Sequence, residues 1–138
     1  MGVITDWFPA VSLEDAVSAV ESGTHRGERW EARFGEPDVT LELGLLTSVV
    51  TGVPERDIGD GWGASAMVGD EGLVFEVSSH LVERLGTLPP EAMAAVVDEL
   101  EEACVDWGGD TADVVADLAA FLGRAVGSGR RAYVFLCP

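Results

Sequence analysis

The stretch DVVADLAAFLGRAVGSGRRAYVFL, residues 113–136, decides the fold because it joins a long amphipathic helix to a hydrophobic strand. In its first half, apolar side chains recur with the 3.6-residue period of a helix, and Asp113 and Asp117 fall on the opposite side. Glycines at 127 and 129 then break this pattern. Residues 132–136 are all apolar or aromatic, which is typical of an interior strand with both faces covered.

Working outward, two more strands are predicted. Residues 1–11 carry an apolar, β-prone pattern, and Pro9 suggests that this strand lies at an edge of the sheet. Residues 73–77 form a second β-prone run. The Gly- and Asp-rich residues 56–72 are predicted to be the longest irregular region, unless residues 64–68 form a short strand.

Helices are predicted where capping residues frame an apolar stripe. The fold class that follows is α+β: a single compact domain over residues 1–138, mostly helical, with a small mixed sheet that includes the N- and C-terminal strands. Besides the helix that opens the 113–136 stretch, the predicted helices cover residues 12–22, a short piece around 30–34, about 39–51, 79–86 and 90–106.

Negative charge dominates the composition: 25 Asp and Glu stand against 8 Arg, Lys is absent, and the formal net charge is −17. No basic residue or His occurs between Arg84 and Arg124. Such a chain repels nucleic acid and anionic lipid and attracts basic proteins. The same acidity also arises from a GC-rich genome or a salt-adapted proteome. The carboxylates predicted to bind a basic partner are Asp98, Glu99, Glu102, Asp106, Asp113 and Asp117.

Several classes of site are disfavoured by the residues present. Without Lys there is no Walker-type phosphate loop and no Schiff-base enzyme. Neither metal-ligand spacing nor a nucleophile elbow occurs, so we assign no catalytic residue, metal or cofactor. The two Cys are expected to be reduced packing residues. We find neither a signal peptide nor a membrane-spanning stretch and expect a cytoplasmic protein; the oligomeric state stays open.

An alternative site is a pocket near residues 57–70, in which a metabolite would bind or react. An indole among glycines could close such a pocket, and His80 is one of two His that could serve as a general base. Ser78 and Ser79 precede His80, but capping of the following helix explains these hydroxyls more simply than catalysis. The residues of this alternative are Asp57, Asp60, Trp62, His80 and Arg84.

Short motifs in order along the chain resemble the YfbM-like family, a bacterial domain of unknown function. The resemblance implies an α+β fold; it implies no activity and no site residues. Because the late carboxylates are not interrupted by Arg, our leading hypothesis is a non-catalytic protein-binding module, of which an immunity or inhibitor protein is one type, rather than an enzyme. The motifs are MGVI at 1–4, LLTSVVTG at 45–52, AMVG at 66–69, FLGRA at 121–125 and YVFL at 133–136.

Overall fold

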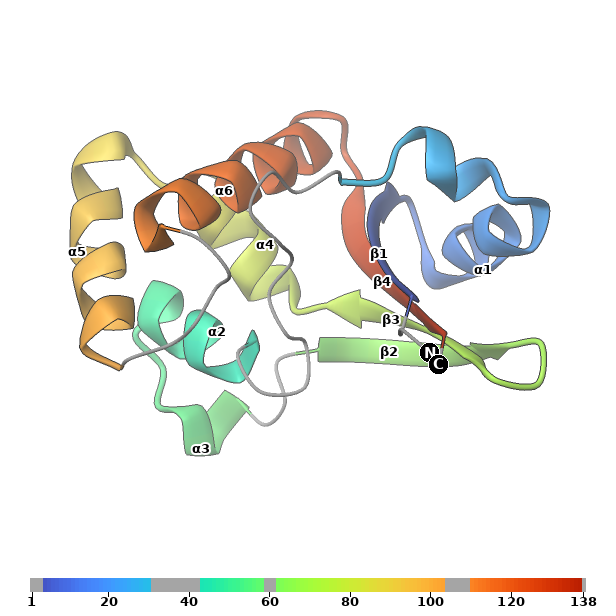
Figure 1. Cartoon of the computed structure of the whole chain (residues 1–138), viewed down its shortest axis with the longest axis horizontal. Coiled ribbons are helices and arrows are strands. Elements are labelled where there is room, and N and C mark those ends of the chain that lie inside the picture. The colour runs from blue at the N-terminus through green and yellow to red at the C-terminus, as the bar shows by residue number, and fades with distance from the viewer. Residues whose placement is uncertain (1–3, 31–42, 59–61, 104–109, 138) are drawn as a thin grey trace.

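One antiparallel sheet forms the centre of the protein (Figure 1). The structure is a computed structural model, which describes residues 4–30, 43–58, 62–103 and 110–137. The strand order of the sheet is β1-β4-β3-β2, so that both chain ends contribute neighbouring strands. The expected α+β class is confirmed, whereas the sheet is antiparallel throughout rather than mixed, because every strand pairing runs antiparallel. The strands are β1 (Ile4–Ala10), β2 (Trp62–Val68), β3 (Gly72–Val77) and β4 (Arg131–Cys137).

The last strand, β4, lies inside the sheet and is covered on both faces, as its unbroken apolar sequence predicted. Ala132 and Val134 belong to the larger core, which the late helices cover. Tyr133, between them, points into a smaller core with Phe8, beneath the first helix. Alternate residues of a strand face opposite sides, so one strand serves both cores.

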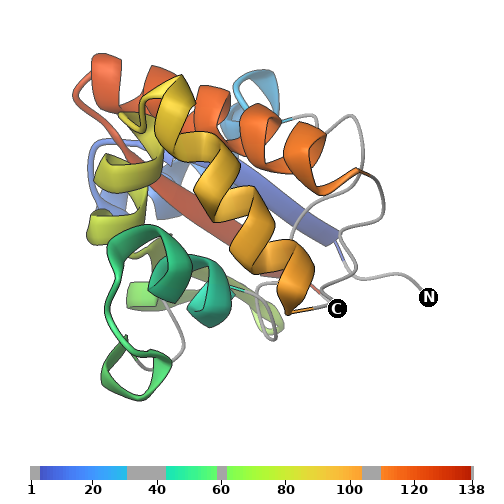
Figure 2. The ribbon, with the colours of Figure 1, turned by 90° about the vertical axis from the view of Figure 1, so that its left-hand side faces the viewer.

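Helices cover the two faces of the sheet unequally (Figure 1). On one face lie α1 (Leu13–Ser22) and the short 3-10 turn at Thr24–Gly27. On the other face, α4 and α6 pack against the sheet and each other, while α5 packs on α2 and α6, farther from the sheet (Figure 2). These remaining helices are α2 (Leu43–Thr51), α3 (Glu55–Ile58), α4 (Ser79–Gly86), α5 (Pro90–Glu102) and α6 (Thr111–Gly127).

Local sequence signals set several of these boundaries. The Ser12 hydroxyl accepts a hydrogen bond from the Asp15 N–H at the start of α1, and Gly23 ends that helix with a φ of 79°. Pro90 opens α5. Ser78 occupies the N-cap position of α4, but its side chain makes no capping hydrogen bond. The capping role that the sequence predicted for this hydroxyl is therefore wrong.

The Gly- and Asp-rich region holds more structure than its composition indicated. The described part of residues 56–72 includes most of α3 and all of β2. Because β2 pairs with β3 as a hairpin, its strand conformation comes from tertiary pairing rather than from local propensity. The start of the helix predicted at 39, the helical piece around 30–34 and the end of the helix predicted to reach 106 lie wholly or partly outside the described residues.

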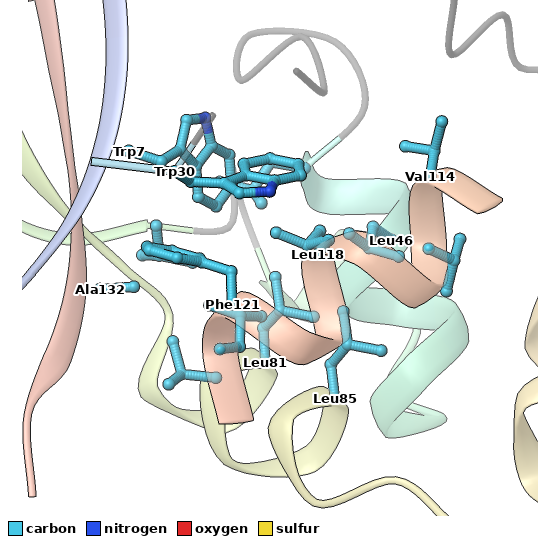
Figure 3. Packing of buried hydrophobic residues seen from close by; sticks show 14 of the residues in the cluster. Trp7, Trp30, Leu46, Leu81, Leu85, Val114, Leu118, Phe121 and Ala132 are labelled. Atoms are coloured by element: carbon cyan, nitrogen blue, oxygen red, sulfur yellow. The ribbon is translucent and has the colours of Figure 1, made fainter. Parts of the chain in front are cut away.

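The larger core fills the space between the sheet and the late helices (Figure 3). Trp30 stacks on Phe121 of α6 with ring centroids 5.8 Å apart, and its edge meets Trp7 of β1 at 5.9 Å. The α4–α6 crossing is close: a Cβ on Gly86 would lie 3.0 Å from the Leu122 carbonyl carbon. Glycine at this crossing lets the two helix backbones approach each other.

Candidate functional site

Helix α5 lies on the outside of the molecule (Figures 1 and 2), and its exposed face carries several carboxylates. Its inner side buries Val96, Val97 and Leu100, and this burial fixes which side chains point outward. Four of the last five residues of α5 are exposed carboxylates. We call Asp98, Glu99, Glu101 and Glu102 the α5 acidic surface.

These carboxylates lie at the unfavourable end of their helix. The C-terminus of a helix carries a partial negative charge, which favours cations, yet the last turn of α5 has no basic residue. Asp98 and Glu102 are four residues apart, and Asp98 and Glu101 are three apart, so like charges also face each other along the helix. The arrangement lowers the stability of α5, and a cation bound there would relieve both effects.

Within the described part of the chain, Asp98, Glu99 and Glu101 form no ion pair with an arginine. The ion pairs formed by Arg lie at the sheet and its adjoining loops, where they engage acidic residues other than Asp98, Glu99 and Glu101. These pairs are Arg29–Asp6 at 3.7 Å, Arg130–Glu28 at 2.8 Å and Arg131–Glu76 at 3.4 Å.

The predicted acidic residues that follow α5 in the sequence do not all belong to the same exposed surface. Asp113 is exposed in the first turn of α6, where a carboxylate favours the helix. Asp117 is half-buried and accepts a 2.9 Å hydrogen bond from the indole Nε1–H of Trp30, which places it in the packing of the core. Asp106 lies outside the described residues.

Exposed carboxylates also occur far from α5. Helix α1, on the other face of the sheet, exposes Glu14, Asp15 and Glu21, and the β2–β3 turn exposes Asp70 and Glu71. Negative charge is therefore not confined to the late helices. What distinguishes α5 is the gathering of four carboxylates in its last five residues, whereas Glu14 and Asp15 lie at the favourable end of α1 and Glu21 alone lies near its C-terminus.

The alternative site is represented by a cavity between α2, the segment leading to α3, and the start of α4. Its volume is about 260 Å³, and it brings together two of the predicted pocket residues, Asp57 and His80. Of the other three, Arg84 does not line it, Asp60 lies outside the described residues, and only the backbone of Trp62 is described. The other lining residues are Thr47, Thr51, Val53 and Ser78.

Hydroxyl, carboxylate and imidazole side chains line the cavity, but they do not form an assembled catalytic triad. Within the described residues, no hydrogen bond joins Ser78, His80 and Asp57. Thr47 and Thr51 donate their hydroxyl protons to the carbonyl oxygens of Leu43 and Thr47, at 2.7 and 2.6 Å, so these hydroxyls are committed to α2. The arrangement suits a small polar ligand better than nucleophilic catalysis.

A buried Asp–His pair escaped the sequence analysis. His25 is 4% exposed; its Nε2 lies 3.0 Å from Asp6 Oδ2, and its Nδ1 lies 3.4 Å from the Ala19 carbonyl oxygen. The ring packs against Phe8 and Phe135. Since both ring nitrogens face protein oxygens, the pair ties the 3-10 turn to β1. No sequence signal links residues 19 positions apart on a turn and a strand.

Two further polar atoms are buried without a hydrogen-bond partner among the described residues: the Trp7 indole Nε1 and the Tyr133 hydroxyl. Burial raises the pKa of Tyr133 above its ordinary value of 10.0, and the carboxylate of Glu76 adds to the rise. A neutral tyrosine is thereby favoured in the folded protein.

Comparison with known proteins gives no relative: no family model, curated protein or solved structure matches this chain. The resemblance to the YfbM-like family stays a prediction from short motifs. Among the described residues, no group of three or more His, Cys, Asp or Glu is placed to hold a metal ion. The helices of the described segments are also too short or too polar to cross a membrane.

Proposed function

We propose that this protein is a non-catalytic binding module for a basic protein, which it contacts through the α5 acidic surface. The observation that carries the proposal is the placement of Asp98, Glu99 and Glu101 at the helix end that disfavours negative charge. A cationic partner seated on α5 would provide the counter-charge that α5 itself lacks. Binding would then recover stability that the free protein gives up.

The mode of action that fits this surface is masking. An inhibitor of the immunity type covers a cationic surface of its target and thereby blocks that surface from its own ligand. Charge complementarity of this kind mainly accelerates association, and the acceleration falls as salt screens the charges. The proposal therefore predicts a strongly salt-dependent association rate.

Affinity capture with the purified protein tests the proposal. The wild type is compared with a triple variant, Asp98→Asn/Glu99→Gln/Glu101→Gln, at low and high ionic strength. Captured proteins are identified by mass spectrometry, and association rates are then measured with the purified partner. We expect basic partners whose association with the variant is slower by roughly tenfold or more at low salt.

The matched control carries the same change in charge on the other face of the sheet: Glu14→Gln/Asp15→Asn/Glu21→Gln on α1. It should change the association rate much less, because α1 and α5 lie at opposite ends of the molecule (Figure 1). Equal losses in both variants would assign the effect to overall acidity. That result, neutral or acidic partners, or capture that ignores salt would each contradict the proposal.

A second candidate function is the binding of a small polar metabolite in the cavity lined by Asp57, Ser78 and His80. A ligand present at about 100 times its Kd would stabilise the fold by about 2.7 kcal/mol. Thermal unfolding with a metabolite panel tests this. The shift should disappear in His80→Ala, an exposed position whose replacement leaves the core intact. A panel without any shift counts against this function.

A further inference from the structure

Strand β2 is an open edge of the sheet. It pairs with β3 on one side, and within the described residues no backbone group of 62–68 bonds to anything beyond β3. Figure 1 shows β2 along the lower margin of the sheet, with α3 near its beginning. Every second residue of such a strand points its N–H and C=O away from the sheet, so β2 offers a row of groups that no described segment pairs.

This edge lacks two of the features that protect edge strands, charged side chains and Pro, although its pairing with β3 is irregular between Trp62 and Ser65. Proteins blunt such edges with charged side chains or Pro. Residues 62–68 read WGASAMV and contain neither, although 24% of the chain is charged. Ser65 and Met67 are both exposed, and Met67 retains 60% of its accessible surface.

The opposite edge, β1, shows what protection looks like in the same molecule. Pro9 removes one donor from β1. The Trp7 carbonyl oxygen accepts a 2.7 Å hydrogen bond from the Trp30 N–H, so the adjoining loop covers part of that edge. Only β2 combines unpaired backbone groups with an uncharged sequence among the described strands.

An apolar row adjoins the open edge. Met67 pairs with Leu73 of β3, which pairs with Leu136 of β4, so the three side chains lie side by side on one face of the sheet. Leu73 and Leu136 are partly buried against the larger core, whereas Met67 extends the row to the solvent-exposed edge. A strand added to β2 would cover Met67 and continue the row.

We propose that β2 is a self-association surface, on which β2 of a second copy pairs antiparallel across a two-fold axis to form one continuous sheet. An uncharged strand is self-complementary in this arrangement, because each copy supplies the same donors and acceptors. Electrostatics favours a second copy over a basic partner at β2. A basic partner would bind more favourably to the carboxylates elsewhere on the molecule. Two copies, each with a formal net charge of −17, repel each other least where the facing strands carry no charge.

The proposed interface has a salt dependence opposite to that of the α5 surface. Asp70 and Glu71 in the β2–β3 turn are exposed and flank the strand, so their repulsion across the two-fold axis opposes pairing. Salt screens this repulsion and strengthens the dimer, whereas it weakens binding of a basic partner. The two proposals therefore succeed or fail separately.

Sedimentation velocity of the full chain over a wide concentration range tests the proposal at about 0.05 M and about 0.5 M salt. We expect a monomer–dimer equilibrium that shifts toward dimer at the higher salt. Met67→Glu places two like charges near each other across the axis and should weaken the dimer by roughly tenfold or more. Val11→Glu is the matched control, because Val11 is 62% exposed and the charge change is identical.

Proline variants Ala66→Pro and Met67→Pro test the backbone contribution. Neighbouring residues point their N–H groups to opposite sides, so one of the two replacements removes a donor that faces away from β3. The replacement that retains the native circular dichroism should abolish the dimer. A protein that stays monomeric at all concentrations, a dimer that persists in Met67→Glu, or an equal loss in Val11→Glu would overturn the proposal.

Discussion

Reversing a single charge at the end of α5 should stabilise the free protein. In Glu101→Lys, the cation lies in the last turn of the helix, where the partial charge is negative, and three residues from Asp98. Removal of the unfavourable charge and gain of a favourable one amount to about 1 kcal/mol together. For a domain of this size, that raises the Tm by about 3–5 °C.

The same kind of substitution at the other end of α5 separates the effect of position along the helix from the effect of net charge. Glu91 is exposed in the first turn, where a carboxylate is favourable, so Glu91→Lys should lower stability by about 0.5 kcal/mol. Both variants change the net charge from −17 by two units. If general repulsion governed stability, both would be stabilised by similar amounts.

Thermal and urea unfolding at low and high salt provide the measurement. The difference between the two variants should shrink as salt screens the exposed charges. Our reasoning about α5 is refuted if Glu101→Lys is no more stable than Glu91→Lys at low salt. In that case the α5 acidic surface would carry no energetic conflict, and the main support for a basic partner would disappear.

Three further predictions concern the core. Asp117→Ala should lower stability by about 1–3 kcal/mol in urea unfolding, because the buried indole N–H of Trp30 loses its acceptor, and Asp117→Asn should lose less. Gly86→Ala should cost about 1–3 kcal/mol because its Cβ meets the α6 backbone, whereas Gly127→Ala, with open space, should be tolerated. Tyr133 is the single Tyr of a chain without Lys. Its raised pKa means that the unfolded chain releases this proton first, so stability should hold up to about pH 10 and then fall as the pH rises through the higher pKa of the folded state; Tyr133→Phe should reduce this alkaline loss, and an unchanged loss would contradict the assignment.

The local pattern of the chain determined most element types. The apolar stripe of α6, the breaker at residues 127–129 and the strand that follows appear where the sequence predicted them. The interior position of β4 and the edge position of β1 also followed, because an unbroken apolar run needs cover on two faces and Pro9 cannot donate to a neighbouring strand. Hydrophobic periodicity and the missing N–H of a proline are properties of a local segment. They are therefore visible in a single sequence without knowledge of the fold.

The sequence identified the residues of the candidate sites, and the tertiary structure determined which of them are exposed and which lie together. Five carboxylates of α5 are exposed because the helix buries its apolar side, which agrees with the apolar stripe predicted for this helix. The helical pattern equally placed Asp117 opposite an apolar stripe, yet the tertiary structure directs it to Trp30, 87 residues earlier. Likewise, Asp57 and His80 line one cavity only because α3 and α4 both pack against α2 in the folded protein.

Most helices and strands, the apolar side of each helix and the total negative charge follow from local sequence alone. The antiparallel strand order, the strand at residues 62–68, the His25–Asp6 pair and the edge strand without a described neighbour became known from the folded structure. The physical reason is that these features depend on contacts between distant segments, and the net free energy of such contacts is set by packing rather than by local propensity.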